Sequence, residues 1–224
     1  MKTKLILLLT FFLPVAGFLC GQGFSPGKER WPVKTSVTHF LPVKEVSLAE
    51  LMGLRSPILS YTKEEQEEYQ DQRFSEVIGT HHLKEGDIVI TSGYILLAAL
   101  EKDSKGADAD YHIQIRTTSE WADSCLVVEA AYPPFIKGNV TLQDSCRKVR
   151  DFFDHFILKG RKKVCFGNKN HTSPYVKITG QLFFDAFHVN TPPRGKQNSV
   201  NEKMKSYTCW EIHPITSISF VGTK

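Results

Sequence analysis

The sequence lacks the short motifs that identify the common enzyme classes. It contains no glycine-rich phosphate loop and no His-Glu-x-x-His pair, the signatures of nucleotide-binding enzymes and zinc proteases. The Cys-x-x-Cys spacing is also absent, which argues against a cysteine-ligated zinc site. No established catalytic chemistry is therefore predicted, and whether the protein is an enzyme stays open at this stage.

A continuous basic stripe is missing as well. The net charge is +4, and the basic residues are dispersed except for the run from Lys159 to Lys163, which we interpret as a solvated helix end. Proteins that bind single-stranded nucleic acid usually combine a basic groove with exposed aromatic rings. Nucleic acid is therefore a less favoured partner than a polar small molecule or a glycan.

The only leader-like segment is a short apolar run at the start of the chain. Two lysines, Lys2 and Lys4, precede the run from Leu5 to Phe12, which is too short to span a membrane. Residues 1–21 are predicted to be a signal peptide, so the protein is expected to be exported to a periplasm or secreted, with no membrane span in the mature chain. Cys20 raises the alternative of a lipoprotein, although the residues before it are not the small ones of a typical lipobox.

Four cysteines follow the predicted signal peptide. In an oxidising compartment an even number favours disulfide bonds, and four residues allow three pairings that the sequence does not distinguish. The disulfide candidates are Cys125, Cys146, Cys165 and Cys209.

The chain then divides into an irregular arm and a strand-rich domain. Residues 22–84 are rich in proline at first and predict an N-terminal arm with one helical stretch, Val46 to Leu54. The acidic segment from Tyr61 to Arg73 predicts an exposed helix or linker. Residues 85–224 predict a single β domain.

Hydrophobic patterning in residues 85–224 predicts three strands, a helix and two more strands. The helix is expected to be capped by Asp144 or Ser145 and to end near Gly160, with an apolar stripe that runs from Val149 to Ile157. This order is that of a small five-stranded barrel of the oligonucleotide/oligosaccharide-binding (OB) type, with one helix between the third and fourth strands. An open α+β sheet is the alternative. The expected strands are Ile88–Leu100, Tyr111–Ile115, Leu126–Ala130, Tyr175–Phe184 and Tyr207–Phe220.

Carboxylate and histidine residues recur on these strands. Alternating side chains in a strand point to opposite faces, so Asp110 and His112 share one face, as do Glu211 and His213. These residue types bind divalent metals such as zinc or manganese and also transfer protons. The complete set of ligand or metal candidates is Asp110, His112, Glu129, Asp185, His188, Glu211 and His213.

Four segments resemble, in order and spacing, a family of exported bacterial proteins that are mostly uncharacterised. They are Glu29-Arg-Trp-Pro-Val-Lys-Thr35, Asp108-Ala-Asp-Tyr-His112, Phe183-Phe-Asp-Ala-Phe-His188 and Glu211-Ile-His-Pro214. The resemblance covers most of the chain from Glu29 onward and departs from the family pattern near Glu64 and between Pro192 and Lys205. It implies domain identity and the same polar residues, but no reaction.

Two functions remain open from the sequence. The favoured one is an exported binding or structural domain of unknown ligand, with a metal or polar-ligand site at the Asp/Glu-His residues. The alternative is a metal-dependent hydrolase that acts on a phosphodiester or a glycan. Each histidine also has a purely structural interpretation, as one half of a hydrogen-bonded pair, with Arg30 and Lys34 as further ion-pair partners of the last strand. Side chains more than about 8 Å apart could not share one cation, because ligand bonds are near 2 Å.

Overall fold

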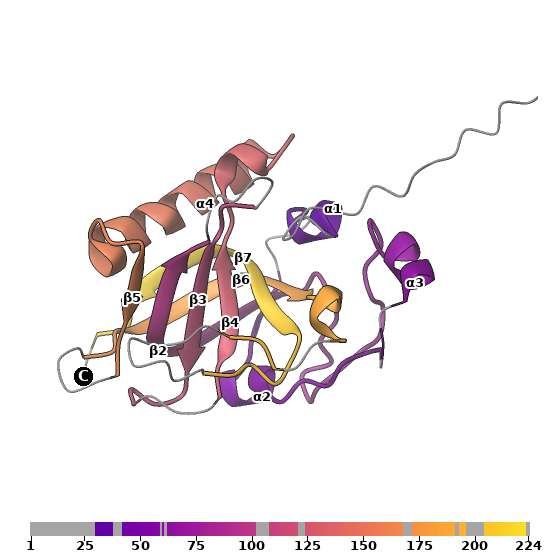
Figure 1. Cartoon of the computed structure of the whole chain (residues 1–224), viewed down its shortest axis with the longest axis horizontal. Helices are drawn as coiled ribbons and strands as arrows, with labels where there is room; N and C mark the ends of the chain where they lie inside the picture. Colours follow the sequence, from indigo (N-terminus) through magenta and orange to yellow (C-terminus); the bar gives the residue numbers. More distant parts are fainter. Residues whose placement is uncertain are drawn as a thin grey trace, which may run out of the picture.

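A computed structural model describes residues 30–37, 42–58, 60, 62–101, 108–120, 124–167, 172–190, 193–195 and 204–222. Five strands form a closed barrel in the order β2-β3-β4-β7-β6, in which β6 pairs back with β2 (Figure 1). The parallel pair is β4 with β7, and the other barrel pairs are antiparallel. This is the strand order of an OB barrel, so the predicted fold class is confirmed. The barrel strands are β2 (Ile88–Leu100), β3 (Tyr111–Arg116), β4 (Leu126–Ala130), β6 (Tyr175–Phe184) and β7 (Trp210–Phe220).

Two short strands extend the sheet on either side of β2. The strand β1 (Val43–Glu45) runs parallel to the first residues of β2, and β5 (Lys163–Cys165) runs antiparallel to its last residues. A register shift between Ile95 and Leu97 in the β2–β3 pair changes which side chains face inward along β2. Such bulges bend a strand and increase its twist, which helps a small sheet to close.

Alternating apolar side chains fill the barrel. The core includes Ile113 on β3, Val128 on β4, Ile178 on β6 and Ile212 on β7, all fully buried. Gly180 in β6 allows β6 and β7 to approach closely, because a Cβ atom there would lie 2.4 Å from the Ile212 side chain and 2.6 Å from the Pro214 carbonyl oxygen. The register of the β6–β7 pair shifts on both sides of this glycine.

One long helix closes an end of the barrel. The helix α4 (Val140–Phe152) continues as a π-helical segment η2 (Phe153–Leu158), and its buried face packs into the barrel core through Val149, Phe153 and Ile157. The predicted cap at Asp144 or Ser145 is wrong. The helix begins one turn earlier because the side chain of Asn139 accepts a hydrogen bond from the Leu142 amide, as N-cap asparagines do.

The arm carries only short elements. Its helices are α1 (Trp31–Lys34), α2 (Leu48–Met52) and α3 (Lys63–Glu68), and the barrel adds two single 3₁₀ turns, η1 (Pro133–Phe135) and η3 (Ala186–His188). In Figure 1, α2 lies at one open end of the barrel, whereas α4 crosses the opposite end. The predicted signal peptide and Cys20 lie outside the described residues. Among the described residues, none of the helices has the length and apolar character needed to cross a membrane.

The predicted disulfide bonds are not formed. All four candidates lie in the described part of the chain, and the structure contains no bond between any two of them. They lie on different elements: Cys125 precedes β4, Cys146 is in α4, Cys165 ends β5 and Cys209 precedes β7. Burial raises the pKa of the Cys125 thiol to about 11 and that of Cys146 to about 12, so both are protonated at neutral pH.

Candidate acidic–histidine centre

Six of the seven polar candidates are buried, and His188 is partly exposed. His112 on β3, Glu129 on β4 and His213 on β7 point away from the apolar core, as their strand positions predicted, and none is more than 6% exposed. The helix α1 and the chain around Arg194 contact this face and shield it from solvent. Burial of several ionisable groups is costly unless they are paired, so their partners decide what the centre can do.

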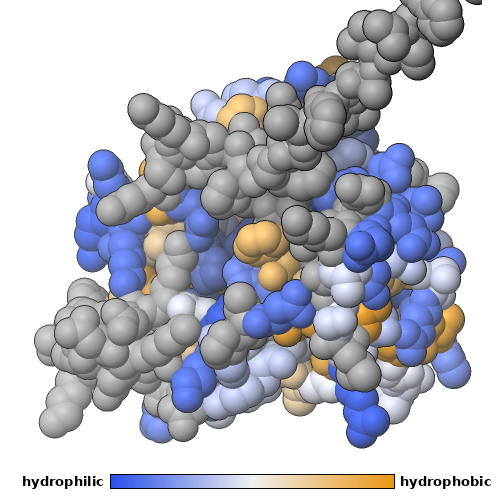
Figure 2. All heavy atoms as spheres, turned by 45° about the vertical axis from the view of Figure 1, so that its right-hand side comes forward, coloured by the Kyte–Doolittle hydropathy of each residue, from blue (hydrophilic) through white to orange (hydrophobic). Residues whose placement is uncertain are grey.

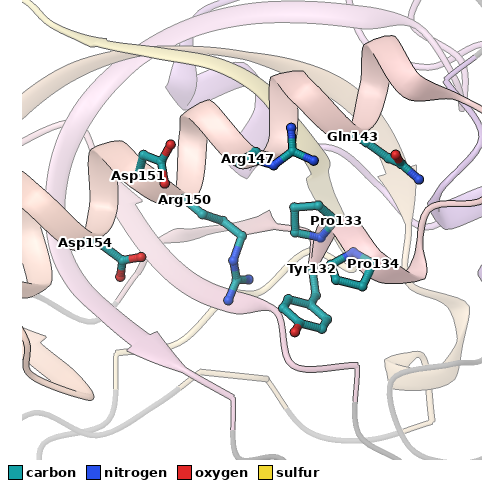
Figure 3. A pocket seen from close by; sticks show the side chains of 8 residues that line it. All are labelled: Tyr132, Pro133, Pro134, Gln143, Arg147, Arg150, Asp151 and Asp154. Carbon is teal, nitrogen blue, oxygen red and sulfur yellow. The ribbon is translucent and has the colours of Figure 1, made fainter.

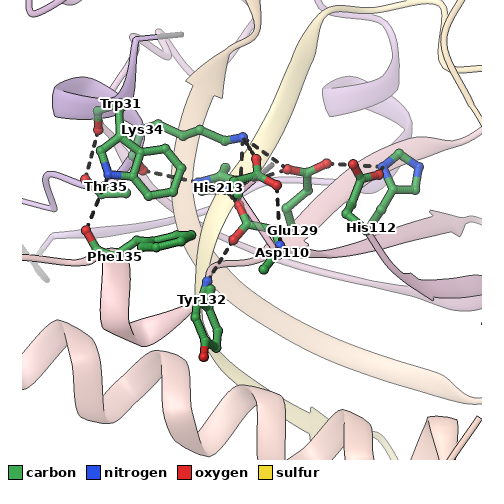
Figure 4. A network of polar contacts seen from close by, with 12 residues as sticks. Trp31, Lys34, Thr35, Asp110, His112, Glu129, Tyr132, Phe135 and His213 are labelled. Atoms are coloured by element: carbon green, nitrogen blue, oxygen red, sulfur yellow. Dashed lines mark hydrogen bonds and ion pairs between the residues drawn. The ribbon is translucent and has the colours of Figure 1, made fainter. Parts of the chain in front are cut away.

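Lys34 supplies a positive charge at the middle of the centre (Figure 4). Its Nζ atom lies 3.0 Å from Asp108 Oδ2, 3.5 Å from Glu129 Oε2 and 3.8 Å from Asp110 Oδ2. Burial by itself would lower the pKa of Lys34, but the carboxylates of Glu129, Asp108 and Asp110 raise it well above its usual value. One ammonium group therefore faces three carboxylates.

Asp108 and Asp110 reach the same lysine because of the residue between them. Ala109 adopts a left-handed conformation with φ of 57°, which is uncommon for a non-glycine residue. Arg150 of α4 donates from Nη1 to the carbonyl oxygen of Ala109 and also to that of Ala130. Asp108 belongs to one of the four motif segments but was not predicted to be a site residue, because this turn is not visible in a strand pattern.

His213 is held between a backbone carbonyl and two carboxylates. Its Nδ1 lies 3.2 Å from the Lys34 carbonyl oxygen, and its Nε2 lies 2.9 Å from Asp110 Oδ2 and 3.7 Å from Glu129 Oε2. A carbonyl can only accept, so Nδ1 carries the proton and Nε2 faces the carboxylates. Metal-binding histidines commonly have this arrangement, with one ring nitrogen bonded to a backbone carbonyl and the other directed at the ion.

Glu129 connects this group to His112. One carboxylate oxygen, Oε1, lies 3.1 Å from Nδ1 of His112, while the other, Oε2, faces His213 and Lys34. Glu101, whose side chain is 34% exposed, lies 3.7 Å from the same His112 nitrogen. Two sets of three potential ligands therefore share Glu129, with the ligand atoms of each set within 4.8 Å of one another: Asp110, Glu129 and His213, and Glu101, His112 and Glu129.

The remaining three candidates gather around Arg194 instead. The guanidinium lies 2.5 Å from Asp185 Oδ2 and 2.7 Å from Glu211 Oε2, and 3.9 Å from Glu129 Oε1. His188 Nδ1 lies 2.6 Å from the same oxygen of Asp185. Asp185, His188 and Glu211 thus border the centre without joining either set of three potential ligands, and Arg194, in a polar loop, was not identified from the sequence.

The pKa values of the carboxyl groups diverge. Burial alone would raise the pKa of Glu129, but Lys34 and the histidines hold it well below the usual range. For Asp185 the Arg194 guanidinium outweighs burial and lowers the pKa to about 2. For Asp108 and Glu211 the effect of burial is the larger one. It raises the pKa of Asp108 to about 6 and that of Glu211 well above its usual value.

The centre carries more acidic groups than permanent cations. Lys34 and Arg194 face five buried carboxyl groups, which belong to Asp108, Asp110, Glu129, Asp185 and Glu211. Protons or a further cation are needed to balance the difference.

A second buried charge on the arm is arranged differently. Arg30, fully buried, makes two bonds to Glu85, of 2.7 and 2.8 Å, and donates to the carbonyl oxygens of Tyr69, Gln72 and Phe184. The Glu85 carboxylate also accepts the amides of Phe74 and Phe184. We call this group the Arg30–Glu85 pair; it joins the arm to β6, and Arg73 lies near enough to interact with both charges.

A separate cavity of about 310 Å³ lies between α4 and η1 (Figure 3). Arg150 extends from α4 toward Tyr132 and lies 3.8 Å from the Tyr111 ring centre and 5.1 Å from that of Tyr132. Because the same guanidinium holds Ala109, this cavity is built on a residue that supports the acidic–histidine centre.

Comparison with known proteins returns no match: no family model, no curated protein and no solved structure is significantly similar to this chain.

Proposed function

We propose that this protein is an exported binding domain whose ligand is a divalent transition-metal cation held by Asp110, Glu129 and His213. The observation that carries the proposal is the position of His213. Its Nδ1 is directed at the Lys34 carbonyl, which leaves Nε2 facing Asp110 and Glu129 at 2.9 and 3.7 Å. Ligands bonded at about 2.1 Å to one ion lie about 3.0 to 3.6 Å apart, so the spacing suits a shared ion.

The chemistry of the three groups favours zinc or manganese. Imidazole and carboxylate together are suited to transition metals rather than to calcium, which prefers six or more oxygen ligands. The hydrogen bond between Nε2 of His213 and Asp110 requires a second proton, in addition to the one on Nδ1. A cation at this point replaces that proton and supplies the positive charge that the five carboxyl groups lack.

Lys34 competes with the ion for the same oxygens. Its ammonium is 3.5 Å from Glu129 and 3.8 Å from Asp110, but only 3.0 Å from Asp108, which is not among the three proposed ligands. We infer that the lysine turns toward Asp108 when the metal binds, so the arm keeps its contact with the barrel.

Elemental analysis of the purified protein and calorimetric titration with zinc and manganese test this proposal. We expect one bound ion and at least a tenfold loss of affinity in Glu129→Gln and in His213→Asn, since even residues that only orient a ligand change affinity by about 10–100-fold. His188→Asn is the matched control, because it removes a histidine that contacts a carboxylate outside the proposed ligands. The proposal is contradicted if the purified protein contains no metal and the titrations show no heat of binding for zinc or for manganese.

A second candidate, metal-dependent hydrolysis, is favoured by His112. This histidine bonds to Glu129 beside the proposed ion and adjoins the partly exposed Glu101, where it could accept a proton from metal-bound water. Assays of the apo and the zinc- or manganese-loaded protein on a phosphodiester and on an aryl glycoside distinguish the two functions. Metal-dependent turnover that is lost in His112→Asn supports hydrolysis, and metal binding without turnover supports the binding domain.

A further inference from the structure

Two phenylalanine side chains are exposed side by side at the end of the barrel where η2 terminates. Phe156 of η2 is 56% exposed and Phe220 of β7 is 48% exposed, and their ring centres lie 5.7 Å apart. Both rings also contact Phe152, at 5.3 and 4.8 Å. Exposing large aromatic rings together is unfavourable in water, so this aromatic cluster is a candidate contact surface.

A group of basic residues adjoins the aromatic cluster. Lys159 follows the last residue of η2, and Arg161 and Lys162 are exposed in the turn that leads from it to β5. β5 contacts η2 and lies beside it in Figure 1. The basic run, interpreted from the sequence as a solvated helix end, therefore lies next to apolar rings.

The two acidic residues of the helix that lie nearest this end are directed elsewhere. Asp151 and Asp154 line the cavity near Tyr132, and Asp154 accepts a hydrogen bond from the Tyr111 hydroxyl at 2.7 Å. The face of the molecule in Figure 2 shows a different pattern, in which hydrophilic and apolar residues are interspersed. Exposed aromatic rings beside basic residues thus characterise the η2 end of the barrel.

We propose that this end binds the surface of an anionic lipid bilayer, with Phe156 and Phe220 inserted among the headgroups and the basic residues facing the lipid phosphates. Aromatic side chains are favoured at the membrane interface, and lysine or arginine near an anionic surface adds about fivefold in affinity for each residue. The three rings pack against one another, whereas a single-stranded nucleic acid needs separate rings on which successive bases stack. This surface is independent of the acidic–histidine centre.

Sedimentation of the purified protein with lipid vesicles tests the proposal. We expect binding to phosphatidylcholine vesicles that contain phosphatidylglycerol, little binding to phosphatidylcholine alone, and weaker binding as salt is raised. Phe156→Ser/Phe220→Ser and Lys159→Glu/Lys162→Glu should each reduce binding by at least tenfold. The matched controls are Phe187→Ser, which removes an equally exposed ring (48%) on η3, and Lys84→Glu/Lys137→Glu, which reverses two exposed charges elsewhere.

Three outcomes overturn the proposal. The first is an absence of binding to the anionic vesicles. The second is equal binding by Lys159→Glu/Lys162→Glu and by its control, Lys84→Glu/Lys137→Glu. The third is an unchanged affinity in Phe156→Ser/Phe220→Ser together with tight binding to a single-stranded oligonucleotide, which would identify a polyanion site without membrane insertion. Circular dichroism of each variant verifies that these surface changes leave the fold intact.

Discussion

Arg30 and Lys34 are four residues apart on the same arm, both are buried, and their surroundings differ in one respect. The Arg30 guanidinium faces one carboxylate and three carbonyl oxygens, so its charge is matched. The Lys34 ammonium faces three carboxylates, so the negative charge around it exceeds its own positive charge. Buried charge alone does not indicate a site. An excess of one sign does, because it requires something more than the chain supplies.

The largest effect is expected from Arg30→Met. The substitution leaves Glu85 buried without its cation, and loss of one partner of a buried pair costs about 3–5 kcal/mol. Unfolding in urea measures the change in the free energy of unfolding. The double variant Arg30→Met/Glu85→Gln is the control and should recover part of the loss, because it removes the unpaired charge and glutamine can still accept one of the two backbone amides. No loss in Arg30→Met would refute the structural role of the Arg30–Glu85 pair.

A smaller and conditional effect is expected from Lys34→Met. Without metal, the carboxylates of Asp108, Asp110 and Glu129 lose their shared cation, at a cost of about 3 kcal/mol. Saturating zinc should restore most of this, because a ligand that binds only the folded state stabilises it. Thermal unfolding with and without zinc measures both steps. Equal stabilisation of the wild type and Lys34→Met by zinc would show that the lysine does not compete with the ion.

The smallest effects are expected from pH, and they have opposite signs on two carboxyl groups. The folded pKa of Asp185 is lowered to about 2, so its contribution is present above the unfolded value of about 3.9 and is lost as the pH falls toward 2. The folded pKa of Asp108 is raised to about 6, so the folded state binds the proton more tightly and stability rises as the pH falls from about 6 to 4.

Unfolding free energies measured between about pH 2 and 7 test these signs, and each change amounts to roughly 2.5–3 kcal/mol. Asp185→Asn should flatten the profile below about pH 4 and Asp108→Asn the part between about 4 and 6. If Asp108→Asn instead makes the unfolding free energy depend more steeply on pH in that range, the charge of Lys34 and not burial determines the pKa of Asp108.

Hydrophobic alternation predicted the barrel well because burial on one face of a strand leaves a period of two in the sequence. The bounds of β2, β4 and β6 agree with prediction, and the outward orientation of His112 and His213 follows from the same parity. The helix start was missed because a single side chain, Asn139, decides it.

The composition of the site was less predictable. Asp110, Glu129 and His213 come together as the strand pattern allowed. Asp185 instead pairs with Arg194 and His188, because the connection between β6 and β7 places Arg194 beside Ser206. Lys34 comes from the arm, whose position on the barrel follows from tertiary contacts such as the Arg30–Glu85 pair. The disulfide prediction rested on an expected compartment and on an even count, and neither fixes the distance between two thiols.

The strand β2 pairs with four others, β1, β3, β5 and β6. Both of its edges are therefore occupied along most of its length, and fraying of any one neighbour leaves the others in place. Its amide hydrogens should exchange with solvent only when the whole barrel unfolds, whereas amides of the arm exchange through local opening. The exchange rates of β2 would thus report the global free energy of unfolding.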